Sequence, residues 1–572
     1  MPEFNLLMTE AGRTLCGTPW NEYPRPTLRR NSFLNLNGEW EFTVSGSPDV
    51  PAAFDRRIRV PFPPESQLSG IGECFPEESY LWYRRTFAAP TMTDGGRVLL
   101  HFGAADQTAA VYLNGIHLGT HSGGYEPFTF DVTDALRAEN TLTVRVEDHL
   151  DSHILPWGKQ KHRRGGMWYT PVSGIWQTVW AETVPHEYIR DILTETDGGS
   201  VVMHIGGADG GSIGITTPDG VLDIPFTGDK AEFTLDSPRM WSPEDPYLYY
   251  AEVRTAHDCV STYFAVRTLD IKTVGGYPRL CLNGKPYFFH GVLDQGYWPD
   301  GLYTAPSDDA LIYDIELMKR LGFNMLRKHI KVEPMRWYYH CDRLGMLVWQ
   351  DMPSGGGQYN LLTISAPLIT GIHLKDSHYR LFARTDAQGR EDFTRELTEL
   401  ITQLQNCPCI VLWVPFNEGW GQFDAKSAVR LIRRLDPTRL IDHASGWHDQ
   451  GVSDVKSLHV YFKPYRFRPD KKGRAVVLSE FGGYNLPVAG HTWNTKNFVY
   501  KGYQTPEALG EAVKTLYETQ IIPARRAGLA ADVYTQLSDV EDEVNGFVTY
   551  DRRVEKLPEA LMQAIAQELR GD

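Results

Sequence analysis

Residues 411–422, VLWVPFNEGWGQ, decide the predicted fold of this chain together with residues 475–484, AVVLSEFGGY. Each segment begins with a run of β-branched and large apolar residues, which is typical of a buried strand. Each run ends at a glutamate, Glu418 in the first segment and Glu480 in the second, with glycine close behind it. A buried strand that ends in an acid and opens into a glycine loop is typical of the C-terminal mouth of a parallel α/β barrel, where catalytic groups lie.

Outward from these two segments, strand-like runs alternate with helical patterns. The eight runs are residues 287–293, 323–329, 346–352, 410–418, 439–445, 457–462, 475–480 and 532–539. The helical patterns are residues 307–322, 333–345, 390–406, 424–435, 506–528 and 557–569. The fifth and sixth connections, 446–456 and 463–474, are weak as helices. This alternation predicts a (β/α)8 TIM barrel over residues 273–572. The stretch 353–384 is predicted to be a long loop that shapes or covers the mouth.

The preceding residues have the pattern of β-sandwiches. Residues 1–183 contain short runs of alternating apolar and polar residues, such as GEWEFTV at 38–44 and TLTVRVED at 141–148. Residues 184–272 repeat this style in a shorter module, which predicts an immunoglobulin-like β-sandwich. The dipeptide Asn114-Gly115 predicts a hairpin turn. Helical patterns are missing from both modules.

Composition and charge narrow the classes of function. The chain has 572 residues, which suggests about three or four domains. It has 57 Lys and Arg against 72 Asp and Glu, for a net charge of −15, which argues against nucleic acid or an anionic membrane as a partner. No apolar run approaches the roughly 20 residues that span a bilayer, and no secretory signal is visible.

The cysteines indicate a reducing compartment. There are seven, an odd number without the spacing of a disulfide framework, so we expect reduced thiols in a cytoplasmic protein. Cys407-Pro408-Cys409 resembles a metal or redox pair, but no second Cys or His pair stands nearby to complete a site. A turn before the strand that ends at Glu418 is the better interpretation.

The two glutamates predict glycosidic bond cleavage. If the eight runs are strands, Glu418 ends the fourth strand and Glu480 ends the seventh, and the two acids can face each other across the mouth. A retaining glycosidase holds two carboxyl groups about 5 Å apart, one as nucleophile and the other as acid and base. Arg327 and Tyr461 are predicted to support an ionised Glu480, which makes Glu480 the nucleophile. Glu418 is the predicted acid, because Trp413, Phe416 and Trp420 surround it in the sequence and an apolar setting raises a carboxyl pKa.

Further polar and aromatic residues at strand ends are candidates for sugar binding. Asn417 precedes the acid and is placed to bind a hydroxyl beside the reacting carbon. His329 and His459 are either satisfied core histidines or direct sugar contacts, and Trp493 either stacks on a sugar or packs on the barrel. Arg327 is as well explained by a structural ion pair as by a supporting role. The predicted substrate-binding set is Arg327, His329, Asp351, Asn417, Trp447, His459, Tyr461, Trp493 and Gln536.

Several motifs in both halves of the chain resemble glycoside hydrolase family 2, the family of β-galactosidases, β-glucuronidases and β-mannosidases. In the barrel they are GFNMLRKHIKVEP (322–334), LVWQDMPSGG (347–356), VPFNEGWGQFD (414–424) and LSEFGGY (478–484). Near the N-terminus they are YPRPTLRRNSFLNLNGEWEF (23–42), LLHFGAADQTAAVYLNG (99–115), GGYEPFTFDVTDAL (123–136) and WYTPVSGIWQTVW (168–180). The resemblance implies a jelly-roll sugar-binding domain over residues 1–183 and an exo-acting, retaining β-glycosidase. It also implies that Glu418 is the acid and base and Glu480 the nucleophile.

The resemblance leaves the sugar open. A β-galactoside is the leading expectation because that activity is common in the family, and β-glucuronide, β-mannoside and arabinoside remain alternatives. Gly165 and Gly166 stand before Met167-Trp168, where large β-galactosidases carry an acid that helps to bind sodium. Asn494-Thr495-Lys496 has the letters of the β-glucuronidase carboxylate motif, but it follows Glu480 too closely and is interpreted as coincidence.

Two other classes of protein are weighed against a glycosidase. One is a carbohydrate-binding protein with an inactive barrel, and the other is an unrelated barrel enzyme such as a metal hydrolase or an aldolase. The expected partner is an oligosaccharide or glycoside, with a homo-oligomer left open. No metal site is predicted and the chemistry requires no cofactor, while a dependence on magnesium or sodium stays open.

Overall fold

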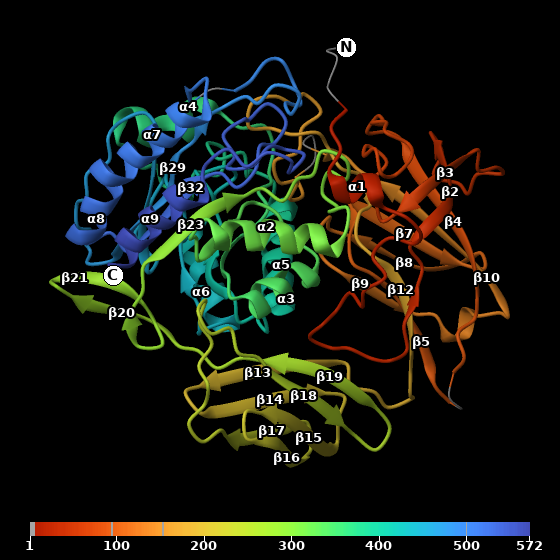
Figure 1. Ribbon diagram of the computed structural model, residues 1–572. Helices are drawn as coiled ribbons and strands as arrows, with labels where there is room; N and C mark the ends of the chain where they lie inside the picture. Colours follow the sequence, from red (N-terminus) through yellow and green to blue (C-terminus); the bar gives the residue numbers. More distant parts are fainter. Residues whose placement is uncertain (1–5, 93–94, 151–153, 499, 572) are drawn as a thin grey trace.

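The computed structural model describes residues 6–92, 95–150, 154–498 and 500–571 (Figure 1). Its first domain is a β-sandwich of two antiparallel sheets. One sheet has the order β1-β12-β5-β9, and the other has the order β3-β2-β4-β10-β7-β8. The first sheet contains β1 (Leu34–Asn35), β12 (Val179–Val184), β5 (Arg97–Phe102) and β9 (Phe128–Asp131). The second contains β3 (Arg56–Val60), β2 (Gly38–Ser45), β4 (Tyr80–Ala88), β10 (Glu139–Glu147), β7 (Thr108–Leu113) and β8 (Ile116–Ser122).

The alternation seen in the sequence accounts for this sandwich. In β2, the side chains of Trp40 and Phe42 are fully buried while Glu39 is exposed. Asn114 and Gly115 join β7 to β8 with φ of 54° and 82°, as the predicted hairpin turn requires. The expectation that helices are absent was wrong for α1 (Glu10–Thr14). That helix is too short to show an apolar period, and the Thr9 side chain caps it.

The second domain is the predicted β-sandwich. Its seven antiparallel strands are connected in the order β13-β14-β17-β16-β15-β18-β19, and β17 and β16 pair only at Lys230 and Thr227. Its core contains apolar side chains from several strands, including Val201, Ile213 and Val253. The strands are β13 (Asp191–Asp197), β14 (Ser200–Gly206), β15 (Gly210–Thr217), β16 (Gly220–Thr227), β17 (Lys230–Thr234), β18 (Tyr249–Arg254) and β19 (Cys259–Phe264). A small sheet of β20 (Leu269–Val274), β21 (Tyr277–Leu282) and β22 (Lys285–Pro286) leads into the barrel.

The third domain is the predicted TIM barrel. Its eight strands are all parallel, in the order β27-β26-β25-β24-β23-β32-β29-β28. They are β23 (Phe289–Asp294), β24 (Met325–Lys328), β25 (Leu347–Asp351), β26 (Ile410–Val414), β27 (Leu440–Ile441), β28 (Val455–Val460), β29 (Ala475–Gly482) and β32 (Ala531–Thr535). Each falls within or overlaps one of the eight predicted runs, so the prediction of the strands is confirmed. Ser457 donates a hydrogen bond to Asp442 (2.9 Å), which links the two end strands β28 and β27.

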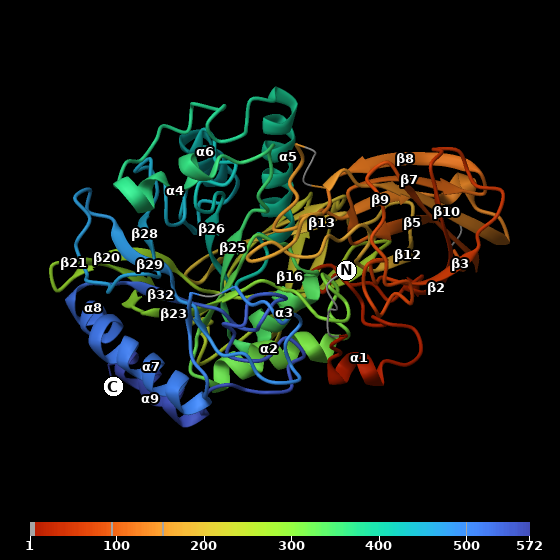
Figure 2. The same cartoon turned by 90° about the horizontal axis from the view of Figure 1, so that it is seen from above.

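Helices cover the outside of the barrel (Figure 2). They are α2 (Asp308–Arg320), α3 (Met335–Leu344), α5 (Ala387–Leu404), α6 (Ala425–Leu435), α7 (Pro506–Leu516), α8 (Ile522–Ala527) and α9 (Glu559–Arg570). The predicted single helix over 506–528 is interrupted by a π-helical turn at Tyr517–Ile521, just before Pro523. Proline lacks the N–H of a regular helical bond, which accounts for the irregular turn. In the described part of the chain, no helix is both long and apolar enough to cross a bilayer.

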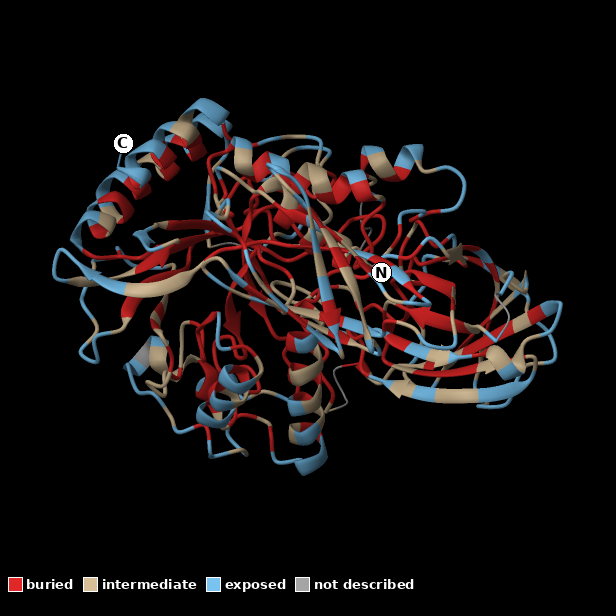
Figure 3. Cartoon of the chain, turned by 90° about the horizontal axis from the view of Figure 1, so that it is seen from below, coloured by how far each residue is buried: buried red, intermediate tan, exposed pale blue. Residues whose placement is uncertain are grey.

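The segment 353–384 is not loop throughout. It contains α4 (Leu361–Thr370), whose N-terminus is capped by Asn360 and whose end is marked by Gly371 in the left-handed region. The prediction of a loop was therefore wrong for these residues, because the Gly, Ser and Thr around them masked a short apolar helix. Burial is concentrated in the barrel strands and the inner faces of the sandwiches (Figure 3).

The first domain contacts the barrel mouth directly. The backbone N–H groups of Trp157 and Gly158 both donate to the carbonyl of Ser354, at 2.8 and 2.9 Å. The indole Nε1 of Trp157 donates to the carbonyl of Gly356 at 3.1 Å. Both acceptors lie just after β25, so a loop of the first domain is fixed beside the C-terminal end of a barrel strand.

Candidate active site

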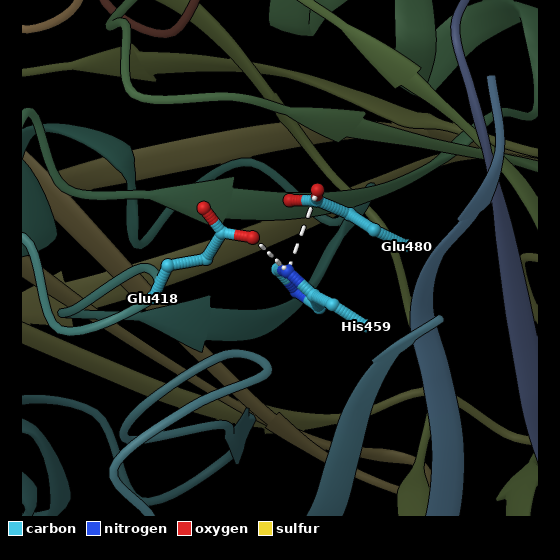
Figure 4. Close-up of side chains that lie close together, drawn as sticks. All are labelled: Glu418, His459 and Glu480. Atoms are coloured by element: carbon cyan, nitrogen blue, oxygen red, sulfur yellow. Dashed lines mark hydrogen bonds and ion pairs between the residues drawn. The ribbon is translucent and has the colours of Figure 1, made fainter. Parts of the chain in front are cut away.

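Two glutamates and a histidine meet at the mouth of the barrel (Figure 4). Glu418 follows β26, His459 lies near the end of β28 and Glu480 lies in β29. One side-chain atom of each, a carboxylate oxygen or a ring nitrogen, lies within 4.8 Å of the others. The exposed fractions of Glu418 and Glu480 are only 8% and 5%. The structure therefore brings the two predicted acids together in a nearly closed space.

Arg327 of β24 binds one carboxylate oxygen of Glu480. Its Nη1 lies 3.0 Å from Oε1 of Glu480, and its Nε and Nη2 bind the two carboxylate oxygens of Asp351 at 3.1 and 3.0 Å. Nη2 also donates to Oδ1 of Asn417 at 2.8 Å. Burial opposes the charge of Arg327, but Asp351 and Glu480 raise the pKa of the guanidinium overall. All three guanidinium nitrogens are thus committed to side chains of the protein.

Tyr461 binds the second carboxylate oxygen of Glu480. Its hydroxyl donates to Oε2 of Glu480 at 2.5 Å and lies 2.9 Å from the hydroxyl of Thr535. Glu480 therefore accepts one bond from a cation and one from a phenol, on different oxygens. Arg327 and Tyr461 are the two residues that the sequence suggested beside Glu480, and their bonds fix the direction of both carboxylate oxygens.

Glu418 has a more polar environment than predicted. Its Oε1 lies 2.6 Å from Nδ1 of His459, and its Oε2 accepts from Nε1 of Trp420 at 3.1 Å. Burial raises the pKa of Glu418, but these contacts and the charge of Lys159 hold the pKa below its usual value. The expectation of a raised pKa was wrong, because His459, and after it the indole N–H of Trp420, bind the carboxylate of Glu418.

The other two aromatic residues point elsewhere. Trp413 donates its Nε1 to Asp436 at 2.8 Å. Phe416 stacks on Phe393 of helix α5, with ring centroids 5.2 Å apart. The side-chain contacts of Glu418 itself are with His459 and Trp420. The backbone of Glu418 is in the left-handed region (φ 51°), a strained conformation that is found more often at functional sites.

The remaining predicted residues occupy different positions. His329 is buried with its Nδ1 2.7 Å from Asp351, and burial and the charge of Lys159 lower its pKa well below the usual value. The ring of Trp447 lies 6.3 Å from that of His459. Gln536 follows Thr535 and is fully buried, accepting from Gln295 and donating to Asn545. The ring of Trp493 packs against Tyr550 at 5.8 Å.

Sequence analysis missed the contribution of the first domain to this site. The rings of Trp168 and Trp420 pack edge to face, with centroids 5.3 Å apart. Tyr169 donates its hydroxyl to Glu543. The charge of Lys159 adds to the lowering of the Glu418 pKa by His459 and Trp420, which together outweigh the opposing effect of burial. The motif WYTPVSGIW was available as a signal, but nothing in its spacing indicates that it reaches a domain more than 100 residues away in the chain.

Glu418, His459 and Glu480 are residue types that bind metals. Two of them, Glu418 and His459, are instead joined by a short hydrogen bond. Ligands bound to one cation at 2.0–2.2 Å are roughly 3 Å or more apart. The Nδ1 of His459 and the Oε1 of Glu418 are separated by 2.6 Å, the distance of a short hydrogen bond. A cation bound by both residues would require their side chains to move apart.

A TIM barrel that carries two facing glutamates at its mouth and follows two β-sandwich domains has the architecture of multidomain glycoside hydrolases. The model for the glycosyl hydrolases family 2 TIM barrel domain matches residues 276–555. The model for the glycosyl hydrolase 2 galactose-binding domain-like unit matches 74–171, and the glycosyl hydrolases family 2 model matches 195–267. This chain belongs to glycosyl hydrolase family 2.

The known relatives are named for two different activities, β-galactosidase and β-glucuronidase. A β-galactosidase of Thermoanaerobacter pseudethanolicus is 26% identical over 441 residues, covering 71% of this chain and 54% of the relative. A putative β-glucuronidase of Formosa agariphila is 24% identical over 528 residues, covering 83% and 59%. The chain thus spans somewhat more than half the length of these two relatives. A solved β-glucuronidase of an uncultured Clostridium sp. has a TM-score of 0.73 at 19% identity, covering 96% of this chain and 99% of that one, which supports the fold.

Proposed function

We propose that this protein is a retaining exo-β-glycosidase that hydrolyses terminal β-linked sugars. The observation that supports it most directly is the approach of the two carboxylates, with one oxygen of each within 4.8 Å. Retaining enzymes hold their carboxyl groups about 5–5.5 Å apart, whereas inverting enzymes need roughly 6.5–9.5 Å to admit a water molecule. An approach of two oxygens to within 4.8 Å is closer to the retaining separation than to the inverting one.

The contacts of each acid support its role in the double displacement. Glu480 attacks the anomeric carbon, since Arg327 and Tyr461 hold its carboxylate by hydrogen bonds on separate oxygens. Glu418 gives a proton to the leaving oxygen as the glycosidic bond breaks. Glu418 then accepts a proton from the water that attacks the same carbon, and this attack releases Glu480. Because Glu418 has a lowered pKa without substrate, binding of the sugar must favour its protonated form.

The closed mouth favours attack on a chain end. Both acids are almost fully buried, and the loop of the first domain that is tied to Ser354 lies beside them. A pocket closed on one side accepts a terminal sugar more readily than the middle of a polysaccharide. The same enclosure excludes water, which strengthens the electrostatic interactions between the acids and the reacting sugar.

A neutral sugar, with β-galactoside first, is the substrate we favour. Arg327 has no nitrogen left to bind a substrate carboxylate. In the Asn494-Thr495-Lys496 segment, Asn494 donates to Asp542 and Lys496 is exposed. These contacts support the interpretation of that segment as coincidence. The second candidate is a β-glucuronide, because several relatives carry the name β-glucuronidase.

Turnover of a panel of p-nitrophenyl β-glycosides tests the proposal. The panel contains galactoside, glucuronide, mannoside and arabinoside, and we expect release of p-nitrophenol from one of them with retention of the anomeric configuration. An inverted product would reject the double displacement. Binding of these sugars without turnover would instead support a carbohydrate-binding protein with an inactive barrel.

A further inference from the structure

We infer that His459 is a positioning residue that couples the charge of Glu480 to the protonation of Glu418. In the free protein its Nδ1 is hydrogen-bonded to Glu418, while the charge of Glu480, 3.4 Å away, competes for the same N–H. That competition ends once Glu480 has bonded to the sugar. This inference rests on the proposed function, because it concerns the two steps of the same reaction.

The geometry places one nitrogen between the two acids. Nδ1 of His459 lies 2.6 Å from Oε1 of Glu418 and 3.4 Å from Oε2 of Glu480 (Figure 4). The same Glu480 oxygen accepts a hydrogen bond from Tyr461, which lies two residues further along, just after β28 ends. The end of β28 therefore brings an imidazole and a phenol to the same carboxylate, and the imidazole is the group that binds Glu418.

The ring of His459 is held so that it cannot turn away. Its Nε2 lies 3.1 Å from Oγ of Ser445, and its side chain has no exposed surface. Gly446 is so close that an added Cβ would lie 2.4 Å from the ring carbon Cγ. Both ring nitrogens are thus engaged by protein groups. This arrangement favours a role in which His459 acts through Glu418 and Glu480. It disfavours the direct bond to a sugar hydroxyl that the sequence left open for His459.

The two chemical steps change the charge beside this ring. In the first step a Glu480 oxygen forms a bond to the anomeric carbon, the glycosidic bond breaks, and the leaving oxygen takes the proton of Glu418. Glu480 is then a neutral ester and attracts the N–H less, while Glu418 has become a carboxylate. In the second step water gives its proton to Glu418 as its oxygen replaces Glu480. A full hydrogen bond from His459 stabilises the carboxylate of Glu418 between these steps, when it must act as a base.

Other titratable groups lie at the ends of the neighbouring strands. Arg327 is on β24 and His329 follows it, Asp351 ends β25, and Asp442 follows β27. The charge of His459 is among the influences on the pKa of Asp351 and Asp442, after burial and Arg327. The groups that face His459 or act on the same acids are Glu418, Glu480, Asp351, Asp442, His329, Arg327 and Lys159.

Two pH profiles separate this role from a merely structural one. The alkaline limb of kcat/KM for a methyl β-glycoside reports Glu418 as acid in the free enzyme. The acidic limb of kcat for a 2,4-dinitrophenyl β-glycoside, whose leaving group needs no proton, reports Glu418 as base in the glycosyl-enzyme. The sugar of both probes is the one that the p-nitrophenyl panel identifies.

His459→Phe removes both nitrogens while keeping a ring. We expect the acidic limb of kcat to move up by about one pH unit or more, because a carboxylate loses a hydrogen bond. The alkaline limb of kcat/KM should move up less, since the charge of Glu480 competes for the N–H in the free enzyme. His459→Gln keeps an N–H donor and should restore part of the shift. It also serves as the test if the Phe variant fails to fold.

His443→Phe is the matched control. His443 is equally buried, its Nδ1 lies 2.6 Å from Oγ of Ser453, and its Nε2 accepts from the backbone of Gln450. This variant should leave both limbs in place. Limbs that do not move in His459→Phe and His459→Gln, or that move by equal amounts, overturn the inference while the proposed function stands. A wild-type protein that hydrolyses no glycoside of the panel overturns both.

Discussion

Trp168 of the first domain packs edge to face against Trp420 of the barrel, with ring centroids 5.3 Å apart, and Trp420 donates its indole N–H to Glu418. A side chain from a separate β-sandwich thus sets the position of a donor to the predicted acid and base. Edge-to-face aromatic pairs contribute about 0.5–1.5 kcal/mol beyond the burial of their area. The contact is therefore strong enough to affect where the Trp420 ring lies.

Trp168→Ala should lower kcat/KM for methyl β-glycosides by about tenfold, since a displacement of a catalytic group has large effects on rate. The effect on dinitrophenyl glycosides should be smaller because their leaving group needs no proton. Steady-state kinetics on the two substrates measures the difference. The matched control is Leu362→Ala on helix α4, a residue with 78% of its surface exposed. Equal losses on both substrates would show that Trp168 acts on folding or binding instead.

Glu480→Ala and Glu418→Ala should give opposite products with azide. Glu480→Ala should abolish hydrolysis, and azide that occupies the space of the lost carboxylate should displace the leaving group of an activated β-glycoside to yield the α-glycosyl azide. Glu418→Ala should keep slow glycosylation of good leaving groups, and azide should yield the β-glycosyl azide. Proton NMR of the products distinguishes the anomers. Glu511→Ala, an exposed glutamate on helix α7, is the control, and exchanged products would mean that the two roles are reversed.

Arg327→Met should destabilise the fold as well as the site. It leaves Asp351 and Glu480 buried without their cation, and breaking a buried ion pair costs about 3–5 kcal/mol. The midpoint of urea unfolding measures the loss. Arg526→Met is the matched control, because Arg526 pairs with Glu568 on the surface, with 65% and 57% of the two side chains exposed. We expect that change to stay within about 1 kcal/mol, and a similar small effect for Arg327 would contradict its predicted part in the fold.

Glu126→Gln should make stability less dependent on pH. Burial and the charge of Glu399 raise the pKa of Glu126 to about 8, so this acid stays protonated in the folded chain over a range in which it ionises in the unfolded chain. Stability from this group is complete below about pH 4.5 and falls as the pH rises toward 8. The variant should therefore be more stable than the wild type at pH 8, by a few kcal/mol at most, and close to it at pH 4.5.

Urea unfolding at the two pH values measures this effect, with Glu139→Gln as the control. Glu139 is an exposed glutamate at the start of β10, in the same domain. If Glu126→Gln has the same stability as the wild type at pH 8, the carboxyl group is ionised in the folded protein and the assigned shift is incorrect.

The eight strands and the positions of both glutamates were predictable, because a buried parallel strand appears in the sequence as an uninterrupted apolar run. The surroundings of Glu418 were not. Trp420 is counted as apolar in a sequence, yet its effect here comes from one N–H whose direction depends on the loop after β26. The part of Trp168 could not be predicted either, since contacts between domains leave no periodic signal. Helix α4 was missed because ten residues with a central proline resemble a loop.

The hydrogen bonds from Trp157 and Gly158 to Ser354 have a consequence for how such enzymes diversify. They attach the rim of the pocket to a module that also has a hydrophobic core of its own. Replacement of residues in that module away from Trp168 can alter which glycoside enters, while Glu418 and Glu480 keep their partners in the barrel. Selection for a new sugar can therefore act on the sandwich first.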